Sequence, residues 1–373
     1  MRIGLDAKRA FANTTGLGEY SRLLIDGLNG MDQDLVLYTP VSGERTDFVR
    51  AGMKVRSGQG AFWRSFGLRK AVMQDGIDIY HGLSNEIPLN AAQWSIPTVV
   101  TIHDLLFHRY PAHYPPGDRL IYRVKTNYAI RNADAIVAPS ASTRDDIVGM
   151  YGIDPGRIHV VPECSHPVFE TTPDPAHRTA VLDTYGIRSP YILSVGSYTR
   201  RKNHETILRA LARLDEDVRP TLLLVGSGGH LERRLRRTAN ELGLMRTLRF
   251  LHDLPQRDLA VLYRSASAAV YASLFEGFGI PLLEAMHAET PLISARNSSL
   301  TEVAGPGTLF FDATDTEQLA AHIRTAMTQD LGDEVQANLR HAQTFSADRM
   351  ARETLAVYET VKNRHEQRYA TSG

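Results

Sequence analysis

The stretch 275–286 combines two glycines, a proline and two carboxylates directly after a predicted strand. Gly277 and Gly279 let the backbone come close to a ligand and expose its amide groups. Pro281 suits the first position of the following helix, because the N–H that proline lacks would be unpaired there. The positive end of that helix then faces the loop, so the segment predicts a site that holds an anion.

Two carboxylates accompany this anion site: Glu276 lies in the loop, and Glu284 lies in the first turn of the predicted helix. A carboxylate repels a phosphate group, so these side chains are better suited to accept hydrogen bonds from hydroxyls. Hydroxyls together with phosphate indicate a sugar nucleotide. The alternative is a tight strand-to-helix turn in which an acid near the helix start is favoured by the dipole.

Three consecutive cations, Arg200, Arg201 and Lys202, follow another predicted strand at 191–196. Ligands of α/β sheets bind beyond the carboxyl ends of the strands, so this position favours contact with phosphate. Arginine can bind phosphate oxygens bidentately, and lysine acts as a point charge. A solvated basic turn is the alternative.

A glycine-containing stretch, 8–21, follows the first predicted strand and carries Gly16 and Gly18 directly before a helical pattern. A dinucleotide-binding protein would have its G-x-G-x-x-G signature at this place. Ser21 stands where the third glycine should be, which disfavours a hydride-transfer enzyme.

A histidine, His103, stands where the predicted strand 98–102 ends. At the carboxyl end of a strand it can reach a ligand site and donate a hydrogen bond to a substrate hydroxyl. A lone histidine is more often structural, and His81 in a neighbouring run carries the same ambiguity.

The composition excludes several other functions. Lys and Arg number 42, as do Asp and Glu, and this balance argues against bulk nucleic-acid binding. The single cysteine, Cys164, cannot form an internal disulfide or a multi-cysteine zinc site, and it fits a reducing, cytoplasmic setting. No apolar run reaches the roughly 18 residues of a membrane span.

The elements that must position these residues alternate along both halves of the chain. Short aliphatic or β-branched runs are followed by amphipathic stretches of helical length, which predicts parallel sheets covered by helices on both faces. The predicted strands are 3–5, 35–38, 77–80, 98–102, 135–138, 158–161, 191–196, 221–225, 247–251, 268–272, 291–294 and 308–311. We therefore expect an α/β protein with two doubly wound, Rossmann-like domains that face each other across a cleft.

Composition shifts predict the domain boundaries. The N-terminal domain is expected at 1–165 and the C-terminal domain at 190–350. The proline-rich stretch 166–189 is expected to be an interdomain linker that runs into one short helix near 176–185. The last segment, 351–373, is predicted as a helix that can pack back on the N-terminal domain.

One basic and aromatic stretch suggests a membrane surface. Between Arg50 and Lys70 there are six basic residues and no acid, interleaved with Phe62, Trp63 and Phe66. This composition suits peripheral contact of residues 50–70 with an anionic lipid surface or a lipid-linked acceptor. The alternative is a solvated face whose aromatic side chains point inward.

Taken together, these motifs resemble glycosyltransferase family 4, and the resemblance covers nearly the whole chain in order and spacing. The span from Glu276 to Glu284 fits the E-x7-E signature of retaining glycosyltransferases. Further segments that resemble the family are 101–105, 138–140 with 161–162, 201–203 and 298–305. The resemblance implies the GT-B fold, with an N-terminal acceptor domain and a C-terminal nucleotide-sugar domain. It also implies retaining, metal-independent transfer without a cofactor.

The resemblance also implies a role for each matching residue. Lys202 and Arg201 would clamp the donor diphosphate, Glu284 would bind the ribose hydroxyls, and His103 would meet the donor sugar. The implied catalytic set is Glu276, Lys202, Arg201 and His103. The implied donor-binding set is Gly16, Gly18, Arg201, Lys202, Leu251, Glu276, Gly277, Phe278, Gly279, Ile280 and Glu284. In it, the amides of Phe278 and Gly279 hold the hexose with Glu276, Gly16 closes on the diphosphate, and 250–254 packs on the base.

One departure from the family pattern concerns the second cation of the clamp. Many relatives have arginine directly after the glycine that corresponds to Gly196, whereas this chain has Ser197. The second clamp is then Arg201 or Arg200.

The resulting prediction is a hexosyltransferase that uses a GDP- or UDP-hexose, with mannose as the first expectation from family prevalence alone. Its acceptor would be a glycan or a lipid-linked glycan in polysaccharide or glycoconjugate biosynthesis. It would have no nucleic-acid partner and would work in the cytoplasm or peripherally at the inner face of the membrane. The alternatives are a nucleotide-sugar-binding module without catalysis and a nucleotide-sugar epimerase on the same fold.

Overall fold

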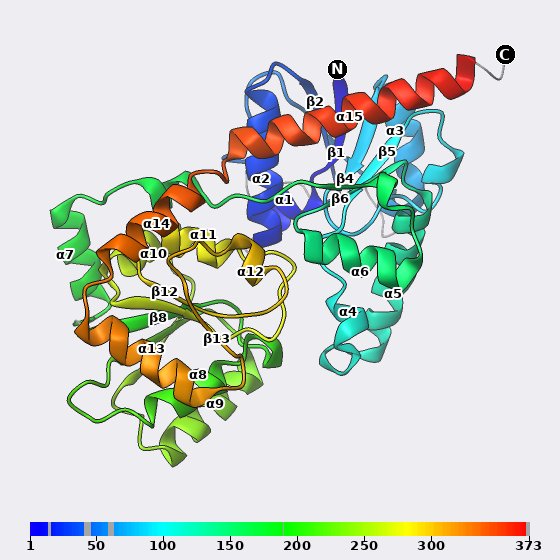
Figure 1. The fold of residues 1–373 in the computed structure, drawn as a ribbon. Coiled ribbons are helices and arrows are strands. Elements are labelled where there is room, and N and C mark those ends of the chain that lie inside the picture. The colour runs from blue at the N-terminus through cyan, green and yellow to red at the C-terminus, as the bar shows by residue number, and fades with distance from the viewer. Residues whose placement is uncertain (14–15, 41–45, 59–62, 189, 371–373) are drawn as a thin grey trace. The chain divides into compact units, whose positions relative to one another are not determined.

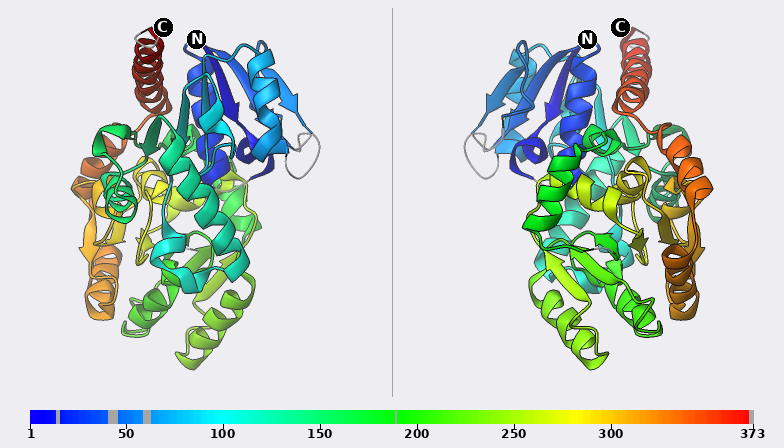
Figure 2. Two further views of the ribbon diagram at one scale, coloured as in Figure 1. Left: turned by 90° about the vertical axis from the view of Figure 1, so that its right-hand side faces the viewer. Right: turned by 90° about the vertical axis from the view of Figure 1, so that its left-hand side faces the viewer.

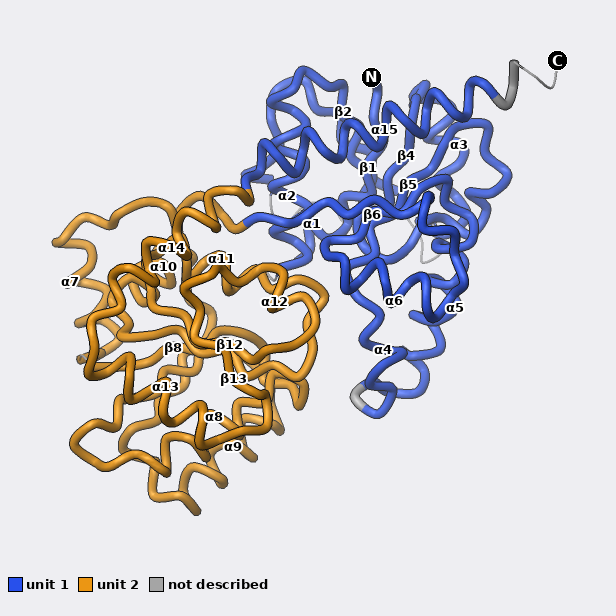
Figure 3. The backbone as a smooth tube through the Cα atoms, in the orientation of Figure 1, with its two compact units in different colours: residues 1–164, 346–373 blue, residues 165–345 orange. Residues whose placement is uncertain are grey.

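The computed structural model describes residues 1–13, 16–40, 46–58, 63–188 and 190–370. The chain forms two compact units, of which unit 1 comprises residues 1–164 and 346–373 and unit 2 comprises residues 165–345 (Figure 3). Each unit contains one parallel β-sheet with helices on both faces (Figure 1). The predicted α/β class with two Rossmann-like domains is therefore confirmed.

The sheet of unit 1 has seven strands in the order β3-β2-β1-β4-β5-β6-β7, and every pairing is parallel. The strands are β1 (Arg2–Asp6), β2 (Asp34–Thr39), β3 (Lys54–Ser57), β4 (Ile79–Gly82), β5 (Thr98–Thr101), β6 (Ala135–Ala138) and β7 (Ile158–Val160). The predicted runs coincide with these strands to within a residue or two. The edge strand β3 was missed, because all of its residues are exposed and it has no apolar run to detect.

Alternation along the strands divides the core of unit 1 between the two faces of its sheet. In β2, Leu35 and Leu37 pack on the face covered by α2 and α15, whereas Val36 and Tyr38 pack on the face covered by α3, α5 and α6. The helices of unit 1 are α1 (Lys8–Ala12), α2 (Gly16–Asn29), α3 (Leu68–Gln74), α4 (Leu106–Arg109), α5 (Pro116–Asn132), α6 (Ala141–Tyr151) and α15 (Ala347–Ala370). Short turns of helix are η1 (Trp63–Gly67), η2 (Ala91–Gln93), η3 (Pro111–His113) and η4 (Pro155–Arg157).

The C-terminal helix α15 belongs to unit 1, as does the N-terminal strand (blue and red in Figure 2). It begins at Ala347 and ends at Ala370. A Cβ on Gly27 of α2 would lie 2.7 Å from the Cβ of Ala351, so this glycine permits the close approach of the two helices. The Tyr358 hydroxyl lies 2.6 Å from Nδ1 of the buried His81 in β4, which ties α15 to the sheet.

The sheet of unit 2 has six parallel strands in the order β10-β9-β8-β11-β12-β13. They are β8 (Tyr191–Val195), β9 (Thr221–Val225), β10 (Leu248–Leu251), β11 (Ala268–Tyr271), β12 (Leu292–Ala295) and β13 (Leu309–Phe311). The helices are α7 (Pro175–Thr184), α8 (His204–Leu211), α9 (Gly229–Glu241), α10 (Gln256–Ser265), α11 (Ile280–His287), α12 (Leu300–Val303), α13 (Thr316–Thr328) and α14 (Gly332–Ala342), with the short turns η5 (Pro167–Glu170) and η6 (Arg200–Lys202).

Residues 166–189, predicted as a linker, differ from that expectation because the described part of the stretch is folded into unit 2. Phe169 is buried in its core, and so is Val181 of α7. The prolines that suggested a linker begin helical turns instead, with Pro167 starting η5 and Pro175 starting α7. A proline fits the first turn of a helix because its missing N–H has no partner there anyway.

Among the helices of the described residues, none is long and apolar enough to cross a membrane.

Candidate active site

Each sheet has one place where the strand order reverses. In unit 2 the adjacent strands β8 and β11 form this switch point, because the chain continues from β8 to β9 on one side and from β11 to β12 on the other. Loops that leave such strands diverge and create the crevice in which α/β proteins bind their ligands. The basic stretch 200–202 follows β8 and the glycine-rich loop 273–279 follows β11. The two motifs found separately in the sequence therefore meet at one switch point.

At this switch point, two cations share one carboxylate. The Lys202 ammonium lies 2.7 Å from Oε1 of Glu276, and the Arg201 guanidinium binds Oε2 of the same carboxylate. The side chains are 11% exposed for Lys202, 11% for Glu276 and 20% for Arg201. Three of the four predicted catalytic residues thus form one ion cluster, in which two cations share one carboxylate. The charge of Glu284 also acts on Lys202.

Burial and pairing act on the charges of this cluster in opposite directions. Burial alone would raise the pKa of Glu276, but the charges of Lys202 and Arg201 outweigh it and lower that pKa to about 2. The pKa of Lys202 is lowered, because its burial outweighs the attraction of Glu276. An anion that approached the cluster would favour the charged form of Lys202.

Asn203, which the sequence singled out only as part of the segment 201–203, fixes the basic turn to the neighbouring strand. Its φ of 53° is the left-handed conformation that asparagine tolerates better than most residues. Its side-chain amide donates to the carbonyl of Ala272, 3.1 Å away, and to that of Ala313, 2.8 Å away. The backbone N–H of Leu274 also donates to the carbonyl of Arg201 at 2.7 Å. These bonds hold the cations beside the loop that carries Glu276.

A glycine leaves room for Lys202 at the end of β8. Gly196 has a φ of 142°, and a Cβ there would lie 3.1 Å from Cε of Lys202. On the neighbouring strand, a Cβ on Gly226 would lie 2.1 Å from the carbonyl oxygen of Gly196. Because neither Gly196 nor Gly226 has a side chain, Lys202 can lie across the end of the sheet.

The loop after β11 is held by serines of the stretch 298–305. The hydroxyl of Ser298 accepts from the N–H of Glu276 at 3.1 Å. The hydroxyl of Ser299 lies 2.9 Å from the carbonyl of Glu276 and 2.7 Å from that of Phe278. Gly277 is buried in this loop, and the ring of Phe278 packs in the core, 6.0 Å from Phe345.

Helix α11 differs in detail from its prediction. It begins at Ile280, which is partly exposed, after Gly279 with a φ of 128°. Pro281 therefore stands in the second helical position and not the first. Glu284 lies in the second turn, since the first turn contains no acid. The hydroxyl of Tyr263 donates to the Glu284 carboxylate at 3.0 Å, so this acid is already positioned by α10.

Leu251, predicted to contact the base, ends β10 at the same carboxyl edge of the sheet and is partly buried. Its carbonyl accepts from the N–H of Gly226 at 3.0 Å. The preceding Phe250 lies under the Arg236 guanidinium, 4.2 Å from the ring centroid.

The remaining predicted residues, His103, Gly16 and Gly18, belong to unit 1. Gly16 begins α2 and does not precede it. A Cβ on Gly18 would lie 2.0 Å from the carbonyl oxygen of Asn13, so this glycine permits a tight entry into α2.

His103 follows β5 and is buried, with both ring nitrogens occupied. Nδ1 lies 2.7 Å from a carboxylate oxygen of Glu163, and Nε2 lies 2.9 Å from the carbonyl oxygen of Leu83. Both partners are acceptors, so both nitrogens donate and the ring is an imidazolium. Burial lowers the pKa of His103, but the bond to Glu163 and its charge raise it further, for a net increase. In this geometry a hydrogen bond to the donor sugar requires His103 to leave Leu83.

The switch point of unit 1 lies between β1 and β4 and holds charges that the sequence reasoning did not identify. The buried Arg64 lies 2.6 Å from Oδ2 of Asp6, at the end of β1, and also pairs with Glu86, which follows β4. Lys125 of α5 lies 2.8 Å from the second oxygen of Glu86. The position of Asp6 at the carboxyl end of the first strand was the signal available in the sequence.

Among the residues that the structure describes, no group of three or more His, Cys, Asp or Glu side chains could hold a metal ion.

Comparisons with known proteins give the family. The chain matches two family models, glycosyl transferases group 1 over residues 186–344 and glycosyltransferase family 4 over residues 14–164. The O-antigen chain mannosyltransferase B of Escherichia coli is 30% identical over 288 residues, which cover 75% of this chain and 74% of that protein. The D-inositol 3-phosphate glycosyltransferase of Acidothermus cellulolyticus is 29% identical over 319 residues, covering 80% of this chain and 70% of that protein.

Solved structures agree on the fold. HepE of Anabaena, in complex with UDP and glucose, matches with a TM-score of 0.76 at 18% identity, over 96% of this chain and 100% of that one. A glycosyltransferase from Rickettsia africae matches with a TM-score of 0.75 at 17% identity, over 96% of this chain and 98% of the other. With the GT-B fold in common and family models matched in both units, the chain belongs to the family 4 glycosyltransferases.

Proposed function

We propose that this glycosyltransferase moves a hexose from a nucleotide-diphosphate sugar to a glycan or lipid-linked acceptor, with retention at the anomeric carbon and without a metal ion. The donor diphosphate binds at the cluster of Arg201, Lys202 and Glu276. The observation that carries the proposal is the pair of cations that shares one carboxylate at the switch point of unit 2.

The chemistry of the reaction suits such a cluster. A nucleoside diphosphate leaves with negative charge, so the transition state is stabilised by fixed positive charge close to the leaving oxygens. Lys202 and Arg201 supply this charge, and the N-terminus of α11 adds the positive end of its helix dipole. Glu276 keeps the two cations in place before the donor arrives. When the diphosphate binds Lys202 and Arg201 in its place, the Glu276 carboxylate accepts hydrogen bonds from the hexose.

The sugar is proposed as mannose, and the nucleotide as GDP or UDP. Mannose is supported by the similarity to the O-antigen chain mannosyltransferase of Escherichia coli. UDP is supported by HepE of Anabaena, which was crystallised with UDP and glucose. The base is expected to lie by Leu251 at the carboxyl end of β10, and the reaction to take place in the cytoplasm.

Thermal stabilisation by a panel of UDP-, GDP- and ADP-sugars tests the donor assignment. A ligand that binds only the folded state at 100 times its Kd stabilises it by about 2.7 kcal/mol. We expect a rise in melting temperature with one base only. The rise should be absent in Lys202→Met and retained in Lys70→Met, a matched change of an exposed lysine in unit 1. No rise with any sugar nucleotide would contradict the proposal.

Transfer itself is tested by incubating the chain, the stabilising donor and candidate glycan acceptors, with release of the nucleoside diphosphate as the measurement. A binding module would release none, and an epimerase would convert the donor without an acceptor. We expect release that depends on the acceptor and persists in EDTA. The anomeric configuration of the product, read by NMR, should equal that of the donor, and the opposite configuration would refute retention.

A further inference from the structure

The first half of α5 is exposed on all sides. Every residue from 116 to 124 is exposed, whereas Thr126, Ala129 and Ile130 in the second half are buried. Four large apolar side chains lie in the exposed half, and we call them the α5 patch: Leu120 (62% exposed), Ile121 (54%), Tyr122 (41%) and Val124 (52%).

The other large exposed apolar side chains of the described residues are scattered. Val55 lies in β3, Phe66 in η1, Met73 in α3, Met150 in α6 and Met245 after α9. Isolated exposed apolar residues are ordinary, but a contiguous group on one element indicates a surface that another phase or molecule covers.

Aromatic contacts hold the α5 patch against the neighbouring helix. The ring of Tyr122 lies 6.3 Å from that of Phe107 in α4 and 6.1 Å from that of Tyr114. Helices α4 and α5 therefore lie side by side, at the same end of unit 1 (Figure 1). The exposed half is a continuation of a helix whose second half is anchored in the core.

The charges beside the patch are positive and have no ion-pair partner within the described part of the chain. Arg119 and Arg123 are exposed, and the one acid of this half of the helix is Asp118. The second half continues with Lys125, which pairs with Glu86.

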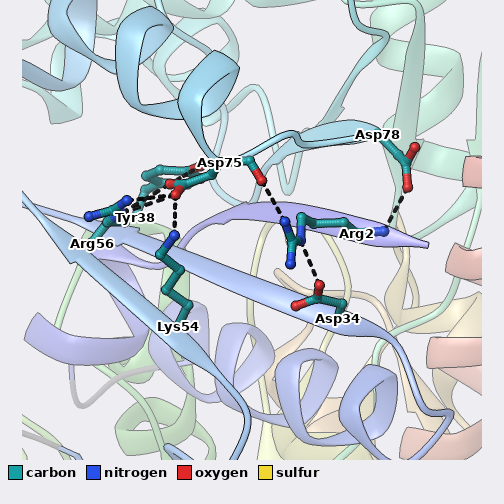
Figure 4. Close-up of polar contacts among 7 residues, drawn as sticks. All are labelled: Arg2, Asp34, Tyr38, Lys54, Arg56, Asp75 and Asp78. Atoms are coloured by element: carbon teal, nitrogen blue, oxygen red, sulfur yellow. Dashed lines mark hydrogen bonds and ion pairs between the residues drawn. The ribbon is translucent and has the colours of Figure 1, made fainter.

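The stretch 50–70, which the sequence suggested for membrane contact, has most of its cations neutralised within unit 1. Figure 4 shows Lys54 and Arg56 converging on the buried carboxylate of Asp75. Arg50 pairs with Asp26, and Arg64 is the buried cation of the switch point. Residues 59–62, including Phe62, lie outside the described residues. Four of the six cations of this stretch are thus engaged by carboxylates, whereas Arg69 and Lys70 are exposed and, like Arg119 and Arg123, have no ion-pair partner among the described residues.

We propose that the α5 patch docks the protein on an anionic lipid surface. Leu120, Ile121 and Tyr122 point about 100° apart around the helix, so they cover more than half of its circumference. A protein partner that covered one face would leave some of them in water, whereas the interface of a bilayer can surround a protruding helix end. The two arginines can reach lipid phosphates while their stems stay among apolar groups. The proposal does not rest on the donor assignment.

The test is binding of the full chain to lipid vesicles, measured by flotation at physiological salt. Phosphatidylcholine vesicles with and without about 30% phosphatidylglycerol separate apolar insertion from charge attraction. We expect binding to the anionic vesicles that weakens as salt is raised. Leu120→Ser/Ile121→Ser/Val124→Ser should weaken binding at least about ten-fold, because buried apolar area is lost. Arg119→Gln/Arg123→Gln should weaken it about 30-fold, at roughly five-fold for each charge.

Matched variants decide which surface binds. Met150→Ser/Met245→Ser removes two exposed apolar side chains elsewhere and should bind like the unchanged chain. Val55→Ser/Phe66→Ser removes the exposed apolar side chains described in 50–70. If this variant lost vesicle binding while the α5 variants kept it, the proposal would be overturned. Absence of binding to anionic vesicles would also overturn it. So would light scattering that shows a dimer which the triple serine variant dissociates, because a second copy would then cover the patch.

Discussion

At the switch point of unit 2 one carboxylate, Glu276, is shared by Arg201 and Lys202, whereas at that of unit 1 two carboxylates, Asp6 and Glu86, share Arg64. Lys125 brings the charges of the unit 1 cluster into balance. Among the side chains joined by ion pairs, the same topology thus sets two cations against one carboxylate in unit 2 and two cations against two carboxylates in unit 1. The charge of Glu284 also acts on the unit 2 cluster, and that of Lys8 on the unit 1 cluster.

The difference teaches what each cluster is suited to do. A buried cluster with a surplus cation lowers its energy when an anion arrives, which is what a diphosphate requires. A balanced cluster has no such surplus, and its charges mainly fix the loops that carry them. We therefore expect changes in unit 1 to affect folding first and changes in unit 2 to affect turnover first.

The largest expected effect is on the stability of unit 1. Arg64→Met leaves Asp6 without its cation in a buried place and should lower the free energy of unfolding by about 3 to 5 kcal/mol. Urea unfolding followed by tryptophan fluorescence reports on this unit alone, because Trp63 and Trp94 both belong to it. Arg50→Met, which removes an exposed ion pair, should cost less than about 1 kcal/mol. Equal losses in the two variants would contradict a stabilising role of the unit 1 cluster.

The next effect is on turnover. Lys202→Met should lower kcat by about 100- to 1000-fold, because it removes a charge that acts on the leaving diphosphate. Its melting in differential scanning calorimetry, which also follows unit 2, should not change. Arg200→Met is the control, since Arg200 lies in the same turn but outside the cluster, and it should retain most of the activity. If Arg200→Met were the more damaging change, the second clamp would be Arg200 and not Arg201.

A smaller effect is expected from moving Lys202 without removing it. Gly196→Ala brings a Cβ to within 3.1 Å of Cε of Lys202 and should lower kcat by about 10- to 100-fold. Gly243→Ala provides a matched control in the same unit, because its φ is also positive, at 72°, and a Cβ there would meet nothing within 4 Å. Both variants should lose similar stability, as judged by differential scanning calorimetry. A similar loss of activity in both would mean that backbone strain and not the lysine is responsible.

The smallest effect concerns pH and His103. Since the bond to Glu163 raises the pKa of His103 in the folded protein, the stabilisation is fully present below the unfolded value of about 6.5 and is lost as pH rises through the folded value. The urea midpoint of unit 1 should therefore fall as the pH rises above 6.5. In Glu163→Gln this pH-dependent step should disappear, whereas in Glu353→Gln, which removes an exposed ion pair of α15, it should persist. A step unchanged in Glu163→Gln would show that another group titrates.

Much of the fold was predictable because the strands of both sheets are buried on both faces and form short apolar runs. The edge strand β3 escaped this reasoning, since three of its four exposed residues are polar and only Val55 is apolar. Prolines misled the interpretation of 166–189 because a proline can end one element or begin another, and only the burial of Phe169 decides between the two.

In the site, the residue types and their order were visible, but their partners were not. Glu276 and Lys202 were singled out from their loops, yet their pairing joins positions 74 residues apart and depends on β8 lying beside β11. Asn203 received no role of its own and Glu163 was not identified, because single polar residues carry no pattern until the structure gives them partners.

The sequence by itself determined the local features of this protein: the apolar runs that form strands, the glycines at their ends and the chemical types of the loop residues. These follow from periodicity and backbone sterics, which act over a few residues. Only the tertiary structure decided which charges meet, that two cations share one carboxylate in unit 2 while two carboxylates share Arg64 in unit 1, and that the start of α5 is left exposed. Those properties depend on distances and burial between residues far apart in the chain, because the strength of a charge interaction is set by its surroundings.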